Sequence, residues 1–127
     1  MSFTKTRLPV GRYEFFQFFA EGSAAAMDES LAPGCAFELA DIRLHLSVLH
    51  ASAEYFRAYV SAVQGSAYNG GFISQLMSTV SDLYWSPSAP MLFQRGDQVR
   101  FTMNLSSANV WGLTVSGWSV AEPVDLT

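Results

Sequence analysis

The residues of this chain that could do metal or acid–base chemistry are few and scattered. His45 and His50 are the only histidines, and Cys35 is the only cysteine. Two histidines five residues apart on or near a β-strand lie on opposite faces, so they do not readily share a metal ion. We therefore expect no metal site and no cofactor. His45 is expected to face outward from a strand, and His50 to lie in a loop.

Catalytic patterns are equally weak. No Gly-x-Ser-x-Gly element accompanies the histidines, so a serine triad has no sequence support. Glu38 and Asp41 fall on opposite faces of a predicted strand unless a bulge realigns them. The tripeptide Arg95–Asp97 reads Arg-Gly-Asp, but Gly-Asp before a strand is ordinary turn chemistry. The residues therefore predict a non-enzymatic protein.

Aromatic rings on the face of a β-sandwich can stack on sugars. Trp118 shares a predicted polar strand face with Thr114 and Ser116, which makes it the best candidate for an exposed ring. Trp118 and Tyr68 are the candidate stacking residues of a glycan site, with polar contacts from Asn69, Ser116 and Asn109. Core packing or a subunit contact is the interpretation that we favour for these rings.

The elements that must position these residues are β-strands. Apolar residues recur at every second position in 42–48 and again in 99–105, which is the period of a strand with one buried face. Turn residues break the chain about every ten residues, and no helical period is long enough to predict a helix. The sequence predicts an all-β fold: one antiparallel β-sandwich of seven or eight strands, with the jelly roll as a variant.

The alternation also predicts local irregularities. Apolar positions change from odd, at Phe37 and Leu39, to even from Ile42 onward. One extra residue at Ala40 or Asp41 would do this, so we expect a β-bulge or bend of the kind that lets a strand move between two sheets. Asn-Gly at 69–70 predicts a hairpin turn, 94–97 a second turn, 21–31 a loop and 121–127 a short tail.

An aromatic segment precedes the alternating strands. Tyr13, Phe15 and Phe19 lie on one face of a predicted strand, and Phe16 and Phe18 on the other. A strand apolar on both faces must be covered on both, either as a central strand or, within residues 1–20, as an arm on a neighbouring subunit. These five residues are the interface candidates. The hypothesis is that replacing Phe16 and Phe18 by Ser abolishes docking and leaves the domain folded.

The composition of the chain limits the kinds of partner that it can bind. The chain has 127 residues, consistent with a single domain over 1–127, and only 14% are charged against about 25% in ordinary domains. Few charges suggest that other subunits cover part of the surface. The net charge is −4 and the seven Lys and Arg are scattered, so direct nucleic-acid binding is not expected. No stretch approaches the roughly 20 apolar residues of a membrane span.

Four stretches together resemble a group of small structural proteins encoded in tailed-bacteriophage genomes. They are FELADIRLHLS, AEYFRAYVSAVQGSAYNGGFISQLM, TVSDLYWSPSAPMLFQRGDQVRF and NVWGLTVSGWSV. In this chain the turn Asn69–Gly71 replaces the more usual Asp after the tyrosine, and the first 36 residues lie outside the resemblance.

The resemblance implies a β-sandwich virion component without enzymatic activity, made in the host cytoplasm. Such a component is a capsid decoration or cement protein, or an accessory protein of the neck or tail. Its partners would be the major capsid protein or neck and tail proteins, contacted by a homo-oligomer or a symmetric array. The alternative is a carbohydrate-binding or receptor-binding module on the virion.

Overall fold

The computed structural model describes residues 6–7, 12–47, 54–104, 110–120 and 124–125. Within these ranges nearly all regular structure is β-strand, and no helix is long and apolar enough to span a membrane. One short 3₁₀ helix covers Ser66–Tyr68. The strands are β1 (Thr6–Arg7), β2 (Arg12–Ser23), β3 (Met27–Leu31), β4 (Phe37–Leu46), β5 (Tyr55–Ser61), β6 (Gly70–Leu76), β7 (Asp82–Trp85), β8 (Met91–Phe93), β9 (Gln98–Met103), β10 (Val110–Val120) and β11 (Val124–Asp125).

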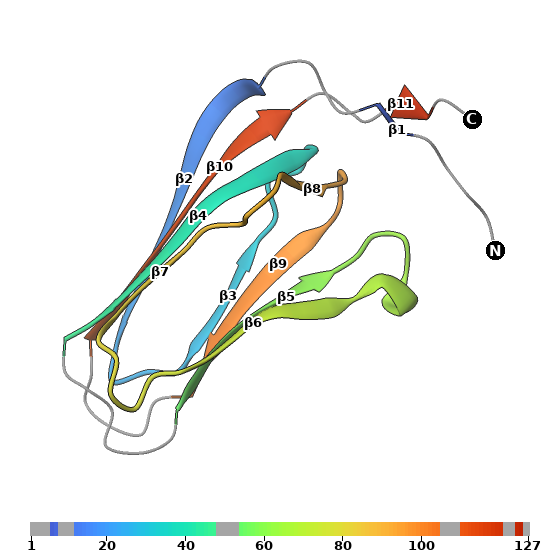
Figure 1. Cartoon of the computed structure of the whole chain (residues 1–127). Helices are drawn as coiled ribbons and strands as arrows, with labels where there is room; N and C mark the ends of the chain where they lie inside the picture. The colour runs from blue at the N-terminus through green and yellow to red at the C-terminus, as the bar shows by residue number, and fades with distance from the viewer. Residues whose placement is uncertain (1–5, 8–11, 48–53, 105–109, 121–123, 126–127) are drawn as a thin grey trace.

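Two antiparallel sheets form the layers of a sandwich (Figure 1). The five-stranded sheet has the order β2-β10-β4-β7, with β8 also pairing β4, and the four-stranded sheet has the order β3-β9-β5-β6. Leaving β8 aside, the pairing is nested: β2 pairs with β10, β3 with β9, β4 with β7, and β5 with β6. This nesting is the topology of a jelly roll, which confirms the predicted sandwich. Among the described residues the two sheets hold nine strands, slightly more than the seven or eight expected.

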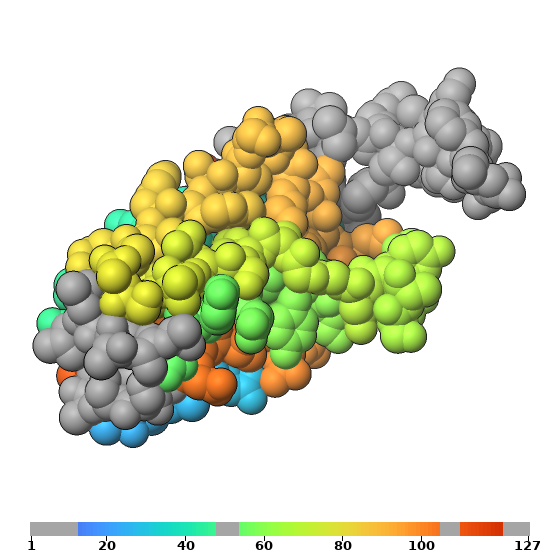
Figure 2. All heavy atoms as spheres, turned by 60° about the horizontal axis from the view of Figure 1, so that its bottom comes forward, coloured from blue at the N-terminus to red at the C-terminus, as the bar shows by residue number. Residues whose placement is uncertain are grey.

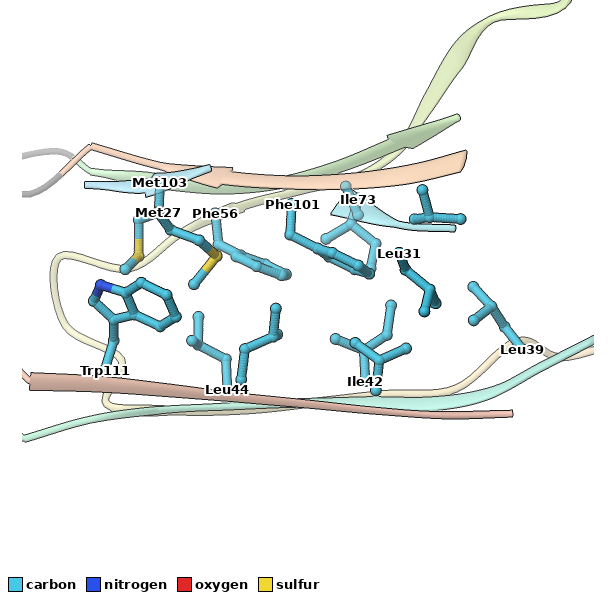
Figure 3. Packing of buried hydrophobic residues seen from close by; sticks show 14 of the residues in the cluster. Met27, Leu31, Leu39, Ile42, Leu44, Phe56, Ile73, Phe101, Met103 and Trp111 are labelled. Atoms are coloured by element: carbon cyan, nitrogen blue, oxygen red, sulfur yellow. The ribbon is translucent and has the colours of Figure 1, made fainter. Parts of the chain in front are cut away.

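The hydrophobic core fills the space between the sheets (Figure 3). Even positions of β4, including Ile42 and Leu44, point inward from one sheet, as the alternating pattern predicts. Side chains at odd positions of β9 point into the core from the other sheet. There Phe101 stacks on Phe56 with ring centroids 6.2 Å apart. Burying these side chains contributes roughly 25 cal/mol per Å² of apolar surface.

The predicted bulge in β4 is present. Ser116 of β10 pairs with Asp41, and the next residue, Gly117, pairs with Leu39, so Ala40 is the extra residue. The strand remains in one sheet throughout, so the expected move between sheets is wrong. The bulge instead separates two partners on the other side of β4: residues 42–45 pair with β7, and residues 37–39 pair with β8.

The predicted loop at 21–31 is wrong. Strand β2 continues to Ser23, and β3 follows after a turn in which Ala24 has a φ of 51°. Met27 and Leu31 of β3 are buried against the core, and β3 pairs with β9. The small residues before Met27 give no sequence signal for a strand. Strand β3 depends on its pairing with β9, which lies far along the chain.

The hairpin expected around Asn69 exists, but its turn differs from the prediction. Strands β5 and β6 pair as expected, whereas Gly70 already belongs to β6. The connection is longer and contains the 3₁₀ helix; it projects at one end of the four-stranded sheet (Figure 1, Figure 2). The Asn69 Oδ1 atom accepts a 2.6 Å hydrogen bond from the Ala62 N–H, so this side chain closes the loop.

Part of the predicted tail forms a strand. Val124–Asp125 pairs antiparallel with Thr6–Arg7 to give the small sheet β1-β11. The remaining tail positions lie outside the described residues.

Candidate functional site: an aromatic surface on the five-stranded sheet

The aromatic segment forms strand β2 at the margin of the five-stranded sheet (Figure 1). The expectation of a central strand between two layers is therefore wrong. The predicted alternation of faces holds: Tyr13, Phe15 and Phe19 point outward and are 69%, 50% and 68% exposed. Large apolar side chains exposed side by side on a sheet face are unusual for a surface that stays in water.

Phe16 and Phe18 point the other way and pack against the core. The ring of Phe16 meets Phe37 edge to face, with centroids 6.2 Å apart. A Cβ on Gly117 would lie 2.6 Å from Phe16 Cζ, so the ring occupies space that only glycine leaves free. Replacing Phe16 and Phe18 would therefore remove side chains that pack on the core, so the outward-facing residues are better positions for a docking test.

Trp118 completes the outward surface. It lies opposite Phe15 in the register of β2 and β10, and the two rings meet edge to face at 5.1 Å. The expected open polar face around Trp118 is wrong, because Ser116 is only 2% exposed and Trp118 is half-buried. We call Tyr13, Phe15, Phe19 and Trp118 the aromatic surface.

The residues predicted for a glycan site are not brought together. Tyr68 is exposed on the β5–β6 connection of the four-stranded sheet, whereas Trp118 belongs to the opposite layer. Among the polar candidates, Asn69 closes its own loop, Ser116 is buried, and Asn109 lies outside the described residues. A shallow groove of about 330 Å³ beside Trp118 is lined by Glu38, Leu39, Ala40 and the loop 87–90.

A polar pair lies at the opposite margin of the same outer face. His45 on β4 and Asp82 on β7 are register partners, and His45 Nδ1 is hydrogen-bonded to Asp82 Oδ1 at 2.6 Å. This bond, and a second one from Ser81, lower the pKa of the Asp82 carboxyl below its usual value. His45 faces outward as expected, while His50 lies outside the described residues. Within the described part of the chain, no group of His, Cys, Asp and Glu could hold a metal ion.

The Arg-Gly-Asp tripeptide is a structural turn. Asp97 is 9% exposed, and its two carboxylate oxygens accept backbone N–H bonds from Val63 and Gln94, each at 2.8 Å. Gly96 has a φ of 92°, which favours glycine at this point of the turn. The carboxylate thus joins the turn before β9 to Val63, in the segment that follows β5, and the turn interpretation is confirmed.

Asp97→Ala is expected to lower the free energy of unfolding by about 2–3 kcal/mol, because two backbone donors lose a charged acceptor in a poorly solvated place. Urea unfolding followed by circular dichroism measures the loss. Asp28→Ala is the matched control, since that carboxylate is exposed and bonds only the Arg100 side chain among the contacts described. Equal losses in the two variants would contradict the role given to Asp97.

Comparison with known proteins gives distant structural neighbours. No protein-family model matches the chain, and no curated protein matches it significantly. The core of the Drosophila protein NLP, whose structure was described for pentamer formation and histone binding, is 13% identical with a TM-score of 0.43. That match covers 83% of this chain and 98% of the NLP core. A protein of the Gt strain of infectious bursal disease virus is 8% identical with a TM-score of 0.34, over 96% of this chain and 39% of the viral chain.

Proposed function

We propose that this chain is a non-enzymatic structural protein of a tailed-bacteriophage virion. It acts as a capsid decoration or cement protein, or as an accessory protein of the neck or tail. The observation that carries the proposal is the aromatic surface: three rings at least half exposed, beside Trp118, on the outer face of the five-stranded sheet. The partner is the major capsid protein or a neck or tail protein.

The physical basis for docking is burial of apolar surface. An aromatic side chain buries about 150–250 Å², and each Å² contributes roughly 25 cal/mol. Three rings that are half exposed or more therefore offer several kcal/mol per copy before the cost of ordering is subtracted. Only 14% of the residues are charged, which suits a surface covered by other subunits. On a symmetric particle the same contact repeats at every equivalent position.

Quantitative mass spectrometry of purified virions tests the proposal. We expect the chain to copurify with particles at a fixed ratio to the major capsid protein. Copies on the order of hundreds indicate capsid decoration, and about six or twelve indicate the symmetric neck or tail. Absence of the chain from purified particles would overturn the proposal.

A further inference from the structure

Among the described strands, β2 is the one long edge strand whose central residues carry no charge. The edge strand β3 has five residues and carries Asp28 and Glu29, and β7 and β8 have four and three residues. The edge strand β6 begins with two glycines at a register shift. Short, charged or irregular edges resist pairing with other chains. Strand β2 has 12 residues and lacks these protections at its centre.

The centre of β2 is a palindrome. Residues 15–19 read Phe-Phe-Gln-Phe-Phe, symmetric about Gln17. We propose that a second copy of this chain pairs with β2 through a twofold axis at Gln17, so that the two five-stranded sheets become one continuous antiparallel sheet. Phe15 then lies opposite Phe19 of the second copy, and Phe16 opposite its Phe18.

The symmetry selects this register. A twofold axis perpendicular to the joined sheet places the outer faces of both copies on the same side. Each residue of β2 must therefore lie opposite a residue of the second copy whose side chain points to the same face. Registers centred on Phe16 or Phe18 place Gln17 opposite a phenylalanine. The register centred on Gln17 pairs all four phenylalanines with one another. Directly opposed aromatic residues are favourable cross-strand pairs.

The backbone is positioned for this pairing. The Glu14 N–H donates to Ser119 Oγ on β10, so even-numbered residues of β2 direct their backbone groups toward β10. Backbone groups alternate along a strand, and those of Gln17 therefore point to the free edge. Two copies of Gln17 can then exchange both of their N–H···O bonds.

Charge and area are compatible with a stable pair. In this register Glu14 lies opposite Ala20 and Glu21 opposite Tyr13, so no carboxylates oppose each other. The facing sides of Tyr13, Phe15 and Phe19 and the edge backbone are covered in the pair, an area on the order of a few hundred Å² on each copy, while the outer faces of the rings stay exposed. Both aromatic surfaces remain on one side of the joined sheet. The pairing does not depend on the virion role.

Sedimentation velocity of the purified full chain over a range of concentrations tests the pairing. We expect the wild type to dimerise and Gln17→Lys to weaken dimerisation about 10-fold or more, because two ammonium groups would face each other across the axis. Ser74→Lys adds the same charge at an exposed position of the edge strand β6 and should leave the dimer intact. A monomeric wild type, or a folded Gln17→Lys that dimerises normally, would overturn the pairing.

Cross-linking keeps the test decisive if Gln17→Lys does not fold. Paired residues of this kind have Cα atoms about 5.5 Å apart, within the range of a disulfide. In a Cys35→Ser background, Gln17→Cys is expected to form disulfide-linked dimers under mild oxidation, and Ser74→Cys is not. Equal cross-linking at both positions, or none at 17, would overturn the pairing. Since no particle is involved, that failure leaves the virion proposal standing, and absence from virions leaves the dimer standing.

Discussion

Trp111→Ala is expected to lower the free energy of unfolding by about 3–5 kcal/mol, the usual cost of truncating a large buried aromatic residue. Trp111 is 2% exposed and closes one end of the core (Figure 3). Its indole lies over Gly22 of β2, where a Cβ atom would come within 2.5 Å of the ring. Its Nε1–H donates a 2.9 Å hydrogen bond to the carbonyl of Ala25, in the turn that leads to β3.

Matched variants separate these contributions. Trp111→Phe retains much of the apolar volume and loses the bond to Ala25, so a smaller loss of stability than in Trp111→Ala is expected. Gly22→Ala places a methyl group on β2 against the Trp111 indole. This overpacking should lower the free energy of unfolding by about 1–3 kcal/mol. Val110→Ala, at an exposed neighbour of Trp111, is the control. Urea unfolding measures all four, and a loss in Trp111→Ala no larger than in Val110→Ala would contradict the assignment.

The strands with the clearest alternation of apolar and polar residues could be predicted from the sequence. In β4 and β9 the alternation of apolar and polar residues matches the buried and exposed faces, because each strand has one face on the core. The change of phase at Ala40 was sufficient to locate the bulge, because one extra residue is the simplest way to move the apolar face.

The elements that were missed depend on partners distant in sequence. Strand β3 has only Met27 and Leu31 as inward anchors, and its pairing with β9 spans most of the chain. The turn at Asn69 looked like a two-residue hairpin because Asn-Gly is common there, whereas the Asn69 side chain instead closes a longer loop.

The candidate site was predictable in its residues but not in its geometry. Alternation alone separated Phe15 and Phe19 from Phe16 and Phe18, as the structure shows. Which set faces the core depends on where β2 lies in the sheet, and that follows from its pairing with β10. The palindrome about Gln17 is a sequence signal, but it acquires meaning only once β2 is known to be an edge.

The double variant Phe15→Ser, Phe19→Ser is expected to reduce incorporation into virions by an order of magnitude or more, if the aromatic surface docks on the particle. Both rings are at least half exposed, so their removal takes little apolar surface out of the folded monomer. The main loss to the fold is the contact of Phe15 with Trp118, about 0.5–1.5 kcal/mol. Incorporation is measured by complementing a deletion phage with the variant and quantifying the chain in purified particles.

The inward pair supplies the control for this experiment. Phe16→Ser, Phe18→Ser removes rings packed on the core and should lower the free energy of unfolding by several kcal/mol. The outward variant should therefore be folded but unincorporated, and the inward variant unstable. Gln17→Lys distinguishes docking from pairing, since it opposes the dimer and leaves the aromatic surface intact. Normal incorporation of a folded outward variant would show that the particle is contacted through another surface, whatever the state of the dimer.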